Sequence, residues 1–247
     1  FGGSLIRPEA TGYGLVYFTE EMLRTRDRDM HGLRVAVSGS GNVAQYTAQK
    51  CMELGALVVT FSDSDGTVYN PEGFSHAHLL ALMELKNERR GRLSKFADEQ
   101  KLKFHAGVTP WQFECEVALP CATQNELNEN DAKLLIKNGC FCVAEGANMP
   151  STLEAVHVFQ KAKILYAPGK ASNAGGVAVS GLEMSQNSMR THWTQGEVDN
   201  RLKNIMINIH QACARHGKHE DHIDYVAGAN IAGFIKVAEA MIAQGIL

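Results

Sequence analysis

The sequence predicts an α/β protein with a Rossmann-like, doubly wound and mostly parallel sheet, followed by additional C-terminal helices. Three observations lead to this fold class. A short apolar, β-branched run at residues 34–37 leads into Gly39-x-Gly41-x-x-Ala44, which opens an amphipathic segment. Short apolar runs then alternate with amphipathic segments, an order that is typical of parallel strands covered by helices. From residue 173 onward the pattern is almost wholly helical.

The first expected element is a helix over residues 9–26, since Pro8 suits a first helical turn and an apolar stripe follows it. Gly12 and Gly14 lower the stability of that helix, so we expect close packing or a ligand beside them. The later elements alternate, with strands expected at 34–37, 56–61, 117–120, 141–144 and 164–166, and helices at 42–54, 75–90, 129–137, 152–161, 173–190, 198–216 and 225–244.

We expect three segments: a connecting helix in residues 1–30, a dinucleotide-binding Rossmann-like domain in 31–185 and a helical segment in 186–247. A chain of 247 residues with 45% hydrophobic residues buries a substantial core. It begins at Phe1 without an initiator methionine, which indicates a piece of a longer protein.

The composition argues against several kinds of partner. The formal net charge is −3, from 24 Lys and Arg against 27 Asp and Glu, so neither nucleic acid nor an anionic membrane is expected. We expect no apolar run that approaches the roughly 20 residues that span a bilayer, and therefore no membrane association. The six cysteines lack a Cys-x-x-Cys pair, which favours reduced thiols and a cytoplasmic location. His216, His219 and His222 lie in a polar stretch, where a solvated loop is a better interpretation than a metal site.

The glycine-rich turn predicts dinucleotide binding. Gly39 permits a tight turn, Gly41 lacks the Cβ that would block a pyrophosphate, and Ala44 lets the new helix pack closely on the strand. The free N–H groups at the helix start suit phosphate oxygens. Asp63 follows Ala44 by 19 residues, close to the spacing of about 20 expected for an acid that binds the adenosine ribose.

Three further loops follow predicted strands, at residues 120–126, 145–150 and 167–176. They carry uncharged hydrogen-bonding side chains suited to a nicotinamide and its ribose, namely Thr123, Gln124, Asn148 and Asn173. Each loop alone is explained by turns and helix caps, but three loops on one sheet edge favour a ligand cleft. Ser180 lies two helical turns after Asn173 and shares that cleft in one interpretation, although a lone helical serine is usually inert.

The residues alone leave NAD and NADP both open. Asp63 favours NAD, because a carboxylate repels a 2′-phosphate. Ser62 and Ser64 instead suit phosphate oxygens, and the basic run at 86–92 brings cations to the same corner if the following helix folds back. The alternative for that run is a solvated basic helix end.

Together these stretches resemble the hexameric, bacterial-type glutamate dehydrogenases, and specifically their NADP-dependent members. The resemblance covers essentially the whole chain and is carried by residues 2–14, 38–44, 119–126, 145–150, 168–177 and 228–234. It implies the cofactor-binding part of an oxidoreductase of amino-acid metabolism, a cytoplasmic homohexamer that uses NADP. The reaction implied is the reversible oxidative deamination of L-glutamate to 2-oxoglutarate and ammonia.

The resemblance also implies roles for individual residues. Thr11 would contact the nicotinamide end, Asn42 the pyrophosphate, and Ser180 the γ-carboxylate of glutamate. The full cofactor-binding set is Thr11, Gly39, Ser40, Gly41, Asn42, Val43, Asp63, Ser64, Lys86, Arg92, Thr123, Asn148 and Asn173, and the substrate-binding pair is Val177 and Ser180. Lys86 and Arg92 stand at matching positions, which tips the choice to NADP.

No catalytic residue is expected in this chain. In the family resembled, the lysine and the aspartate that perform acid–base chemistry lie in an N-terminal domain that we expect to be absent here, and Lys170 is interpreted as a surface lysine. The chain alone is therefore predicted to be inactive. Two alternatives remain: an isolated NADP(H)-binding module, or a leucine- or phenylalanine-type dehydrogenase, which predicts an apolar residue where Ser180 stands.

Overall fold

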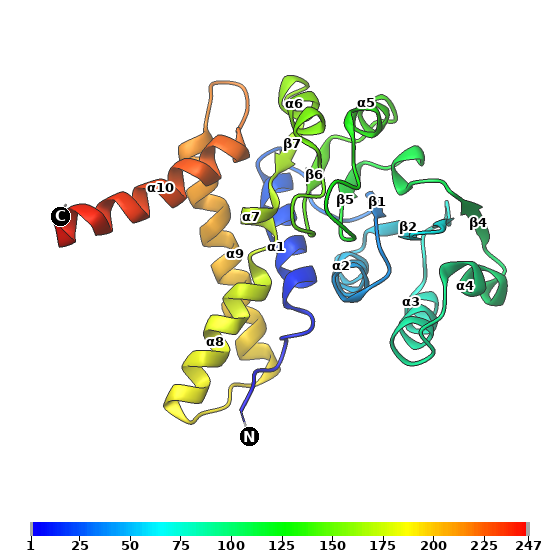
Figure 1. The fold of residues 1–247 in the computed structure, drawn as a ribbon, viewed down its shortest axis with the longest axis horizontal. Helices are drawn as coiled ribbons and strands as arrows, with labels where there is room; N and C mark the ends of the chain where they lie inside the picture. The colour runs from blue at the N-terminus through cyan, green and yellow to red at the C-terminus, as the bar shows by residue number, and fades with distance from the viewer. Residues whose placement is uncertain (1, 246–247) are drawn as a thin grey trace.

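The computed structural model describes residues 2–245, so the outermost residues of the first and last expected segments, 1, 246 and 247, lie outside it. One sheet has the strand order β4-β3-β2-β1-β5-β6-β7 (Figure 1). Five of its strands run parallel: β1 (Arg34–Val37), β2 (Leu57–Asp63), β5 (Val117–Leu119), β6 (Cys142–Ala144) and β7 (Leu165–Ala167). At one edge β3 (Gly66–Tyr69) and β4 (Lys103–Ala106) are antiparallel. The predicted α/β class with a mostly parallel sheet is confirmed.

Helices cover both faces of the sheet. The alternation along β1 assigns the faces, because Val35 and Val37 belong to one buried cluster and Ala36 to the other. The larger cluster joins the sheet to α1 (Ala10–Arg24), α2 (Asn42–Glu53), α3 (His76–Met83), the π-helical turn η1 (Glu84–Glu88), α4 (Leu93–Gln100), α8 (Gly175–Met189) and α9 (Gln195–Gly217). The smaller cluster joins it to the 3₁₀ turn η2 (Pro110–Gln112), α5 (Glu129–Lys137) and α6 (Leu153–Lys161).

Glycines let α1 lie unusually close to its neighbours. A Cβ atom on Gly12 would lie 2.5 Å from the backbone nitrogen of Thr47 on α2, and one on Gly14 would lie 2.8 Å from the Cα of Gly175 on α8. The expectation of close packing at these glycines is therefore confirmed. Through these contacts α1 and the start of α8 are held against the carboxyl ends of the strands, with the short helix α7 (Gly169–Ser172) between β7 and α8.

Among the described residues two strands and two helices were not predicted, namely β3, β4, α4 and the short α7. The four residues of β4 are all half-buried or exposed, as suits an edge strand, and they form no apolar run. β3 follows β2 after a two-residue connection, because Asp63 pairs with Gly66. The helix predicted over 75–90 is instead α3, which ends at Met83 and continues into η1.

The last helix, α10 (Tyr225–Gln244), projects from the body of the molecule (Figure 1). By length and composition this helix could cross a membrane. An 18-residue stretch of it has a mean hydropathy of 1.4, and 6% of that stretch is buried. The expectation that no apolar run is long enough was wrong, because Ala and Gly among the large apolar residues hide the run. A single helix of this kind is weak evidence for a membrane span.

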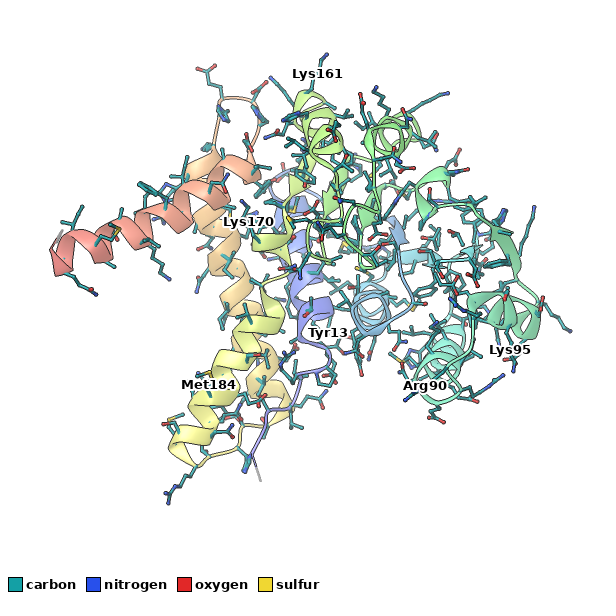
Figure 2. All side chains as sticks on the ribbon, in the orientation of Figure 1. Tyr13, Arg90, Lys95, Lys161, Lys170 and Met184 are labelled. Atoms are coloured by element: carbon teal, nitrogen blue, oxygen red, sulfur yellow. The ribbon has the colours of Figure 1, made fainter. Side chains whose placement is uncertain are left out.

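Lys170 on α7 donates a hydrogen bond to Asn230 on α10 (Figure 2).

The six cysteines lie in the interior, and His216, His219 and His222 lie at the end of α9 and in the loop after it. All six cysteines are buried and free of disulfides. His216 lies in the last turn of α9, and the rings of His219 and His222 stack 4.7 Å apart in the loop before α10. Within residues 2–245 no group of three or more side chains is arranged to hold a metal ion.

Candidate functional site

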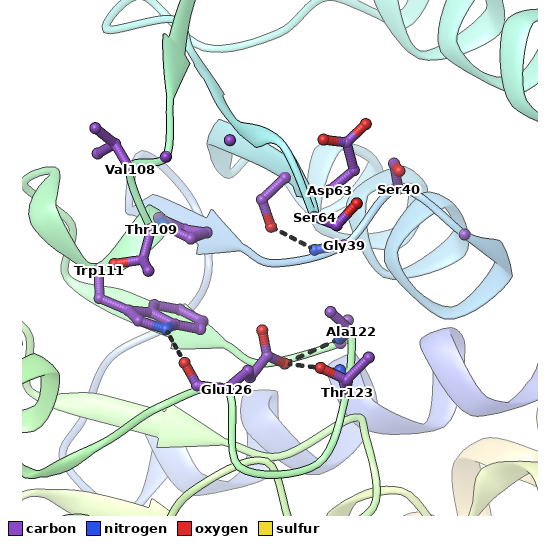
Figure 3. Close-up of a pocket in the computed structure, with 16 residues that line it drawn as sticks. Gly39, Ser40, Asp63, Ser64, Val108, Thr109, Trp111, Ala122, Thr123 and Glu126 are labelled. Atoms are coloured by element: carbon purple, nitrogen blue, oxygen red, sulfur yellow. Dashed lines mark hydrogen bonds between the residues drawn. The ribbon is translucent and has the colours of Figure 1, made fainter. Parts of the chain in front are cut away.

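Two adjoining cavities open along the carboxyl ends of the parallel strands. The first, of about 430 Å³, lies among the turn after β1, the end of β2 and the loop before η2 (Figure 3). The second, of about 720 Å³, lies among the start of α1, the loop after β6 and the start of α8. The two cavities meet at the loop after β5, because both are lined by Cys121, Ala122 and Thr123. In the strand order β1 stands between β2 and β5, so the site occupies the switch point of the sheet, where such folds bind ligands.

The glycine turn lines the first cavity. Gly39 has a φ of +83°, and a Cβ there would lie 3.2 Å from the carbonyl oxygen of Cys121, so the fold itself requires this glycine. Gly41 differs: its φ is −85°, and within the described part of the chain no atom lies within 4 Å of a Cβ built on it. Gly41 is also the N-cap of α2 and offers no side-chain cap, which leaves amide groups of the first helical turn free for an anion.

Residues at the far end of the first cavity form a hydrogen-bonded corner. The Asp63 carboxylate accepts backbone N–H groups on both oxygens, from Asp65 at 3.0 Å and from Leu93 at 2.9 Å. Ser64 Oγ, which lines the cavity, accepts a 2.9 Å hydrogen bond from Nη1 of Arg92. Arg92 therefore contacts this corner through Ser64, although Arg92 itself does not line the cavity. Lys86 does not reach the wall, because its ammonium donates to the carbonyl oxygen of Gly91 at 3.1 Å.

The loop after β5 is held by Glu126, a residue that sequence reasoning did not single out. Its Oε1 accepts from the Ala122 amide at 3.0 Å and from the Thr123 amide at 3.3 Å (Figure 3). The same oxygen accepts from Ser38 Oγ at 2.9 Å. Burial raises the pKa of Glu126 to about 7, although these three hydrogen bonds lower it. Trp111 was also missed; its indole is buried in the wall and donates to the carbonyl oxygen of Glu126 at 3.3 Å.

The second cavity brings together residues that lie far apart in the sequence. The predicted residues that line it are Thr11, Val43, Thr123, Asn148, Asn173, Val177 and Ser180, and Arg7 and Gln124 join them. Asn173 donates to Oδ1 of Asn148 at 2.9 Å and to the carbonyl oxygen of Ala147 at 3.2 Å, so these amides are oriented by each other. Ser180 donates to the carbonyl oxygen of Gly176 at 3.1 Å. Asn42 lines neither cavity and donates instead to the carbonyl oxygen of Pro8 at 3.0 Å.

The second cavity holds polar groups but no base. Among its described lining residues only Arg7 and Cys121 are titratable. Burial raises the pKa of the Cys121 thiol well above its usual range, so the thiol is neutral. The walls can therefore bind and orient a ligand through neutral hydrogen bonds, but they offer no side chain that accepts a proton at neutral pH.

The chain is similar to known proteins along its whole described length. The sequence profile of the glutamate/leucine/phenylalanine/valine dehydrogenases matches residues 2–245. A glutamate dehydrogenase of Bacteroides thetaiotaomicron is 60% identical over 248 residues, which cover 100% of this chain and 56% of that protein. An NADP-specific glutamate dehydrogenase of Escherichia coli is 58% identical over 247 residues, which cover 100% of this chain and 55% of that protein. The crystal structure of Plasmodium falciparum glutamate dehydrogenase superposes on this chain with a TM-score of 0.96 at 50% identity. The superposition covers 100% of this chain and 53% of that one. The chain thus spans about half the length of the curated relatives it matches.

Proposed function

The chain belongs to the glutamate/leucine/phenylalanine/valine dehydrogenase family, and from this we propose that it binds NADP(H) across its two joined cavities as the cofactor-binding part of a glutamate dehydrogenase. In this proposal the pyrophosphate lies at the start of α2, beside Gly39, Ser40, Gly41, Asn42 and Val43. The nicotinamide and its ribose lie in the second cavity, against Thr11, Thr123, Asn148 and Asn173.

The observation that carries the proposal is the open space at Gly41. The backbone there has an ordinary φ, and the surrounding protein leaves room for a side chain. Nothing in the described fold requires glycine at this position, whereas a phosphate group that approaches the backbone does. The free amides of α2 and the neutral lining of the second cavity support the same ligand.

The test is a calorimetric titration of the chain with NADPH. Gly41→Ala should weaken binding by about tenfold or more, because a methyl group then occupies the space of the pyrophosphate. Gly196→Ala is the matched control, since a Cβ on Gly196 also meets no described atom within 4 Å and Gly196 lines neither cavity. Equal NADPH affinity in Gly41→Ala and in the unaltered chain would refute this placement.

We propose NADP rather than NAD as the preferred cofactor. Both Asp63 oxygens are occupied by backbone N–H groups, so this carboxylate holds the corner together and has fewer free lone pairs for ribose hydroxyls. The hydroxyl of Ser64 and the guanidinium of Arg92 supply donors for a 2′-phosphate at the same corner. Lys86 adds positive charge nearby through its contact with Gly91.

We propose L-glutamate and 2-oxoglutarate, with ammonia, as the substrates of the enzyme to which this chain contributes. Val177 and Ser180 face the second cavity from α8, where the serine hydroxyl suits a carboxylate and an apolar side chain there would favour leucine or phenylalanine. Because none of the described residues that line the second cavity accepts a proton at neutral pH, the 247-residue chain alone should show no glutamate oxidation with NADP, even at concentrations that saturate NADP binding. Glutamate turnover by the chain alone would contradict this.

We also propose that the protein acts in the cytoplasm as a homohexamer. Six free, buried cysteines suit a reducing compartment. The large exposed apolar side chains of α8 and α10, such as Met184 (Figure 2) and Phe234, suit burial in a larger assembly. Residues 31–185 would form the dinucleotide-binding domain, with 1–30 and 186–247 as connecting and helical segments.

A further inference from the structure

The first cavity contains acidic groups but no cation. Among its described lining residues the charged side chains are Asp63 and Glu126. A described cation nearby is Arg92, which is not a lining residue and donates to Ser64 Oγ at the Asp63 end of the cavity. A dinucleotide carries negative charge at its pyrophosphate, so two carboxylates facing it would oppose binding. The two carboxylates differ, however, in how they are held.

Glu126 keeps one oxygen free. Its Oε1 accepts three hydrogen bonds, whereas no hydrogen bond reaches Oε2 from any residue between 2 and 245. Figure 3 shows the carboxyl group pointing into the cavity, with the second oxygen turned away from the 122–123 loop. A proton on this oxygen would leave the three hydrogen bonds to Oε1 in place and would add a donor that faces the ligand.

The position of Glu126 links the two parts of the site. Through Ser38 it contacts the residue before the glycine turn, and Ser38 Oγ in turn accepts from the Cys121 amide at 2.8 Å. Through the Ala122 and Thr123 amides it holds the loop that separates the two cavities. One carboxyl group thus sets the spacing between the two turns that would grip a dinucleotide.

We propose that Glu126 contacts the ligand directly and takes up one proton from solvent when an anionic dinucleotide binds, so that its free oxygen donates to the ligand instead of repelling it. This inference rests on the proposed binding of NADP(H). No other group has to give up a proton, because the proton comes from bulk water or buffer. The bound ligand would then be held at both turns by a neutral acid.

The groups that face Glu126 favour this protonation. Glu145, which follows β6, adds like charge and raises the pKa of Glu126. Asp63 lies in the same cavity, but its carboxylate accepts two backbone N–H groups. Cys121 is a neutral thiol and Trp111 contributes only an N–H group to the backbone carbonyl. Burial already places the pKa of Glu126 at about 7 without ligand, so the added negative charge of a bound dinucleotide raises it further, into the range where uptake is measurable.

The experiment is calorimetric titration of the chain with NADPH in two buffers of different ionisation enthalpy, from about pH 6.5 to about pH 8.5. The unaltered chain should take up close to one proton near pH 8, and its Kd should rise by up to about tenfold per pH unit above pH 7. Glu126→Gln, whose amide oxygen can still accept the three hydrogen bonds, should bind without proton uptake and with a Kd that changes little over this range. Circular dichroism confirms that this variant is folded.

Two controls exclude other sources of the pH dependence. NADH lacks the 2′-phosphate, which itself titrates near pH 6, so uptake with NADH must come from the protein. Glu72→Gln removes an exposed carboxylate outside both cavities and should keep the full pH dependence. Identical pH profiles for Glu126→Gln and the unaltered chain, or no proton uptake by the unaltered chain, would overturn the inference while NADP(H) binding stands. Absence of NADPH binding at every pH would refute the proposed function and the inference with it.

Discussion

At the scale of single residues, Gly39 and Gly41 serve different purposes although they stand two positions apart. Gly39 adopts a left-handed backbone against the loop after β5, whereas Gly41 has an ordinary backbone and open space beside it. The first glycine is therefore a requirement of folding and the second a requirement of the proposed ligand. Substitution of Gly39 should therefore change the stability of the fold, and substitution of Gly41 should change the binding of the ligand.

We predict that Gly39→Ala lowers the free energy of unfolding by about 2 kcal/mol, because a Cβ is strained at a φ of +83° and would lie 3.2 Å from the Cys121 carbonyl oxygen. Urea denaturation followed by circular dichroism measures the change. Gly41→Ala is the paired variant and should stay within about 0.5 kcal/mol of the unaltered chain. Equal losses for the two variants would show that the turn has no such division of roles.

Arg92 should determine how well the chain distinguishes NADPH from NADH. Arg92→Gln is expected to weaken NADPH binding by about tenfold, or ~1.4 kcal/mol, because one charge-assisted and largely exposed contact to the 2′-phosphate is lost. NADH affinity should not change. Lys95→Gln is the control, since Lys95 is an exposed cation on α4 that lines neither cavity (Figure 2). A loss of affinity that is equal for both cofactors would contradict the 2′-phosphate contact.

The glycine turn and the Thr123, Asn148 and Asn173 side of the second cavity were predicted from short motifs that follow strands. Thr11, Val177 and Ser180 lie on helices without such a motif, and their assignment to the site rested on the family resemblance.

Glu126 and Trp111 were not predicted. The role of Glu126 arises from a contact with Ser38, 88 positions away, and no local pattern reports such a contact. Its only local signal was a carboxylate in a loop that was otherwise notable for neutral side chains.

At the scale of elements, the antiparallel edge of the sheet contains strands that the pattern of apolar residues does not predict. The parallel strands were found because they are buried on both faces and therefore apolar throughout, as in β5 and β6. The edge strand β4 is exposed or half-buried at all four positions, so its sequence lacks that signal. Its place follows from pairing with β3, which only the folded chain brings beside it.

The last helix gives a prediction about local stability. Beyond Gly228 the side chains of α10 are half-buried or exposed, including Phe234 at 72% exposure. A helix without packing is marginal in water, so the amides of residues 236–244 should exchange with solvent far faster than those of 225–232 when the chain is monomeric. Hydrogen exchange measured by mass spectrometry tests this. Uniform slow exchange along α10 would mean that another surface covers it.

At the scale of the whole molecule, the sheet and the C-terminal helices share one core. Val35 of β1, Val179 of α8, Leu202 of α9 and Tyr225 of α10 belong to the same buried cluster. The chain should therefore unfold as one cooperative unit over most of its length, with the exposed part of α10 as the exception. The order of the strands in this core depends on contacts between distant segments, and the sequence did not reveal it.

His210 should make the stability of this core depend on pH. It packs between Phe18 and Tyr225, with ring centroids 5.4 and 5.5 Å away, and burial lowers its pKa from 6.5 to about 4. As pH falls, the unfolded chain binds a proton first, so stability that is complete above pH 6.5 is lost progressively toward pH 4. His210→Gln should lack this component of the decline, whatever its stability at neutral pH. Thermal unfolding curves at intervals across that range provide the comparison.

Trp111 gives the first cavity a built-in fluorescent reporter. Its indole is buried in the cavity wall and bonded to Glu126, whereas the other of the two tryptophans, Trp193, stacks under Arg201 between α8 and α9. Indole emission overlaps the absorption of a reduced nicotinamide ring, so a nicotinamide held in the joined cavities should quench Trp111 by energy transfer. With Trp193 replaced by Phe, Trp111 would be the single tryptophan of the chain, and its emission would follow the occupancy of the site directly, without label or coupled assay.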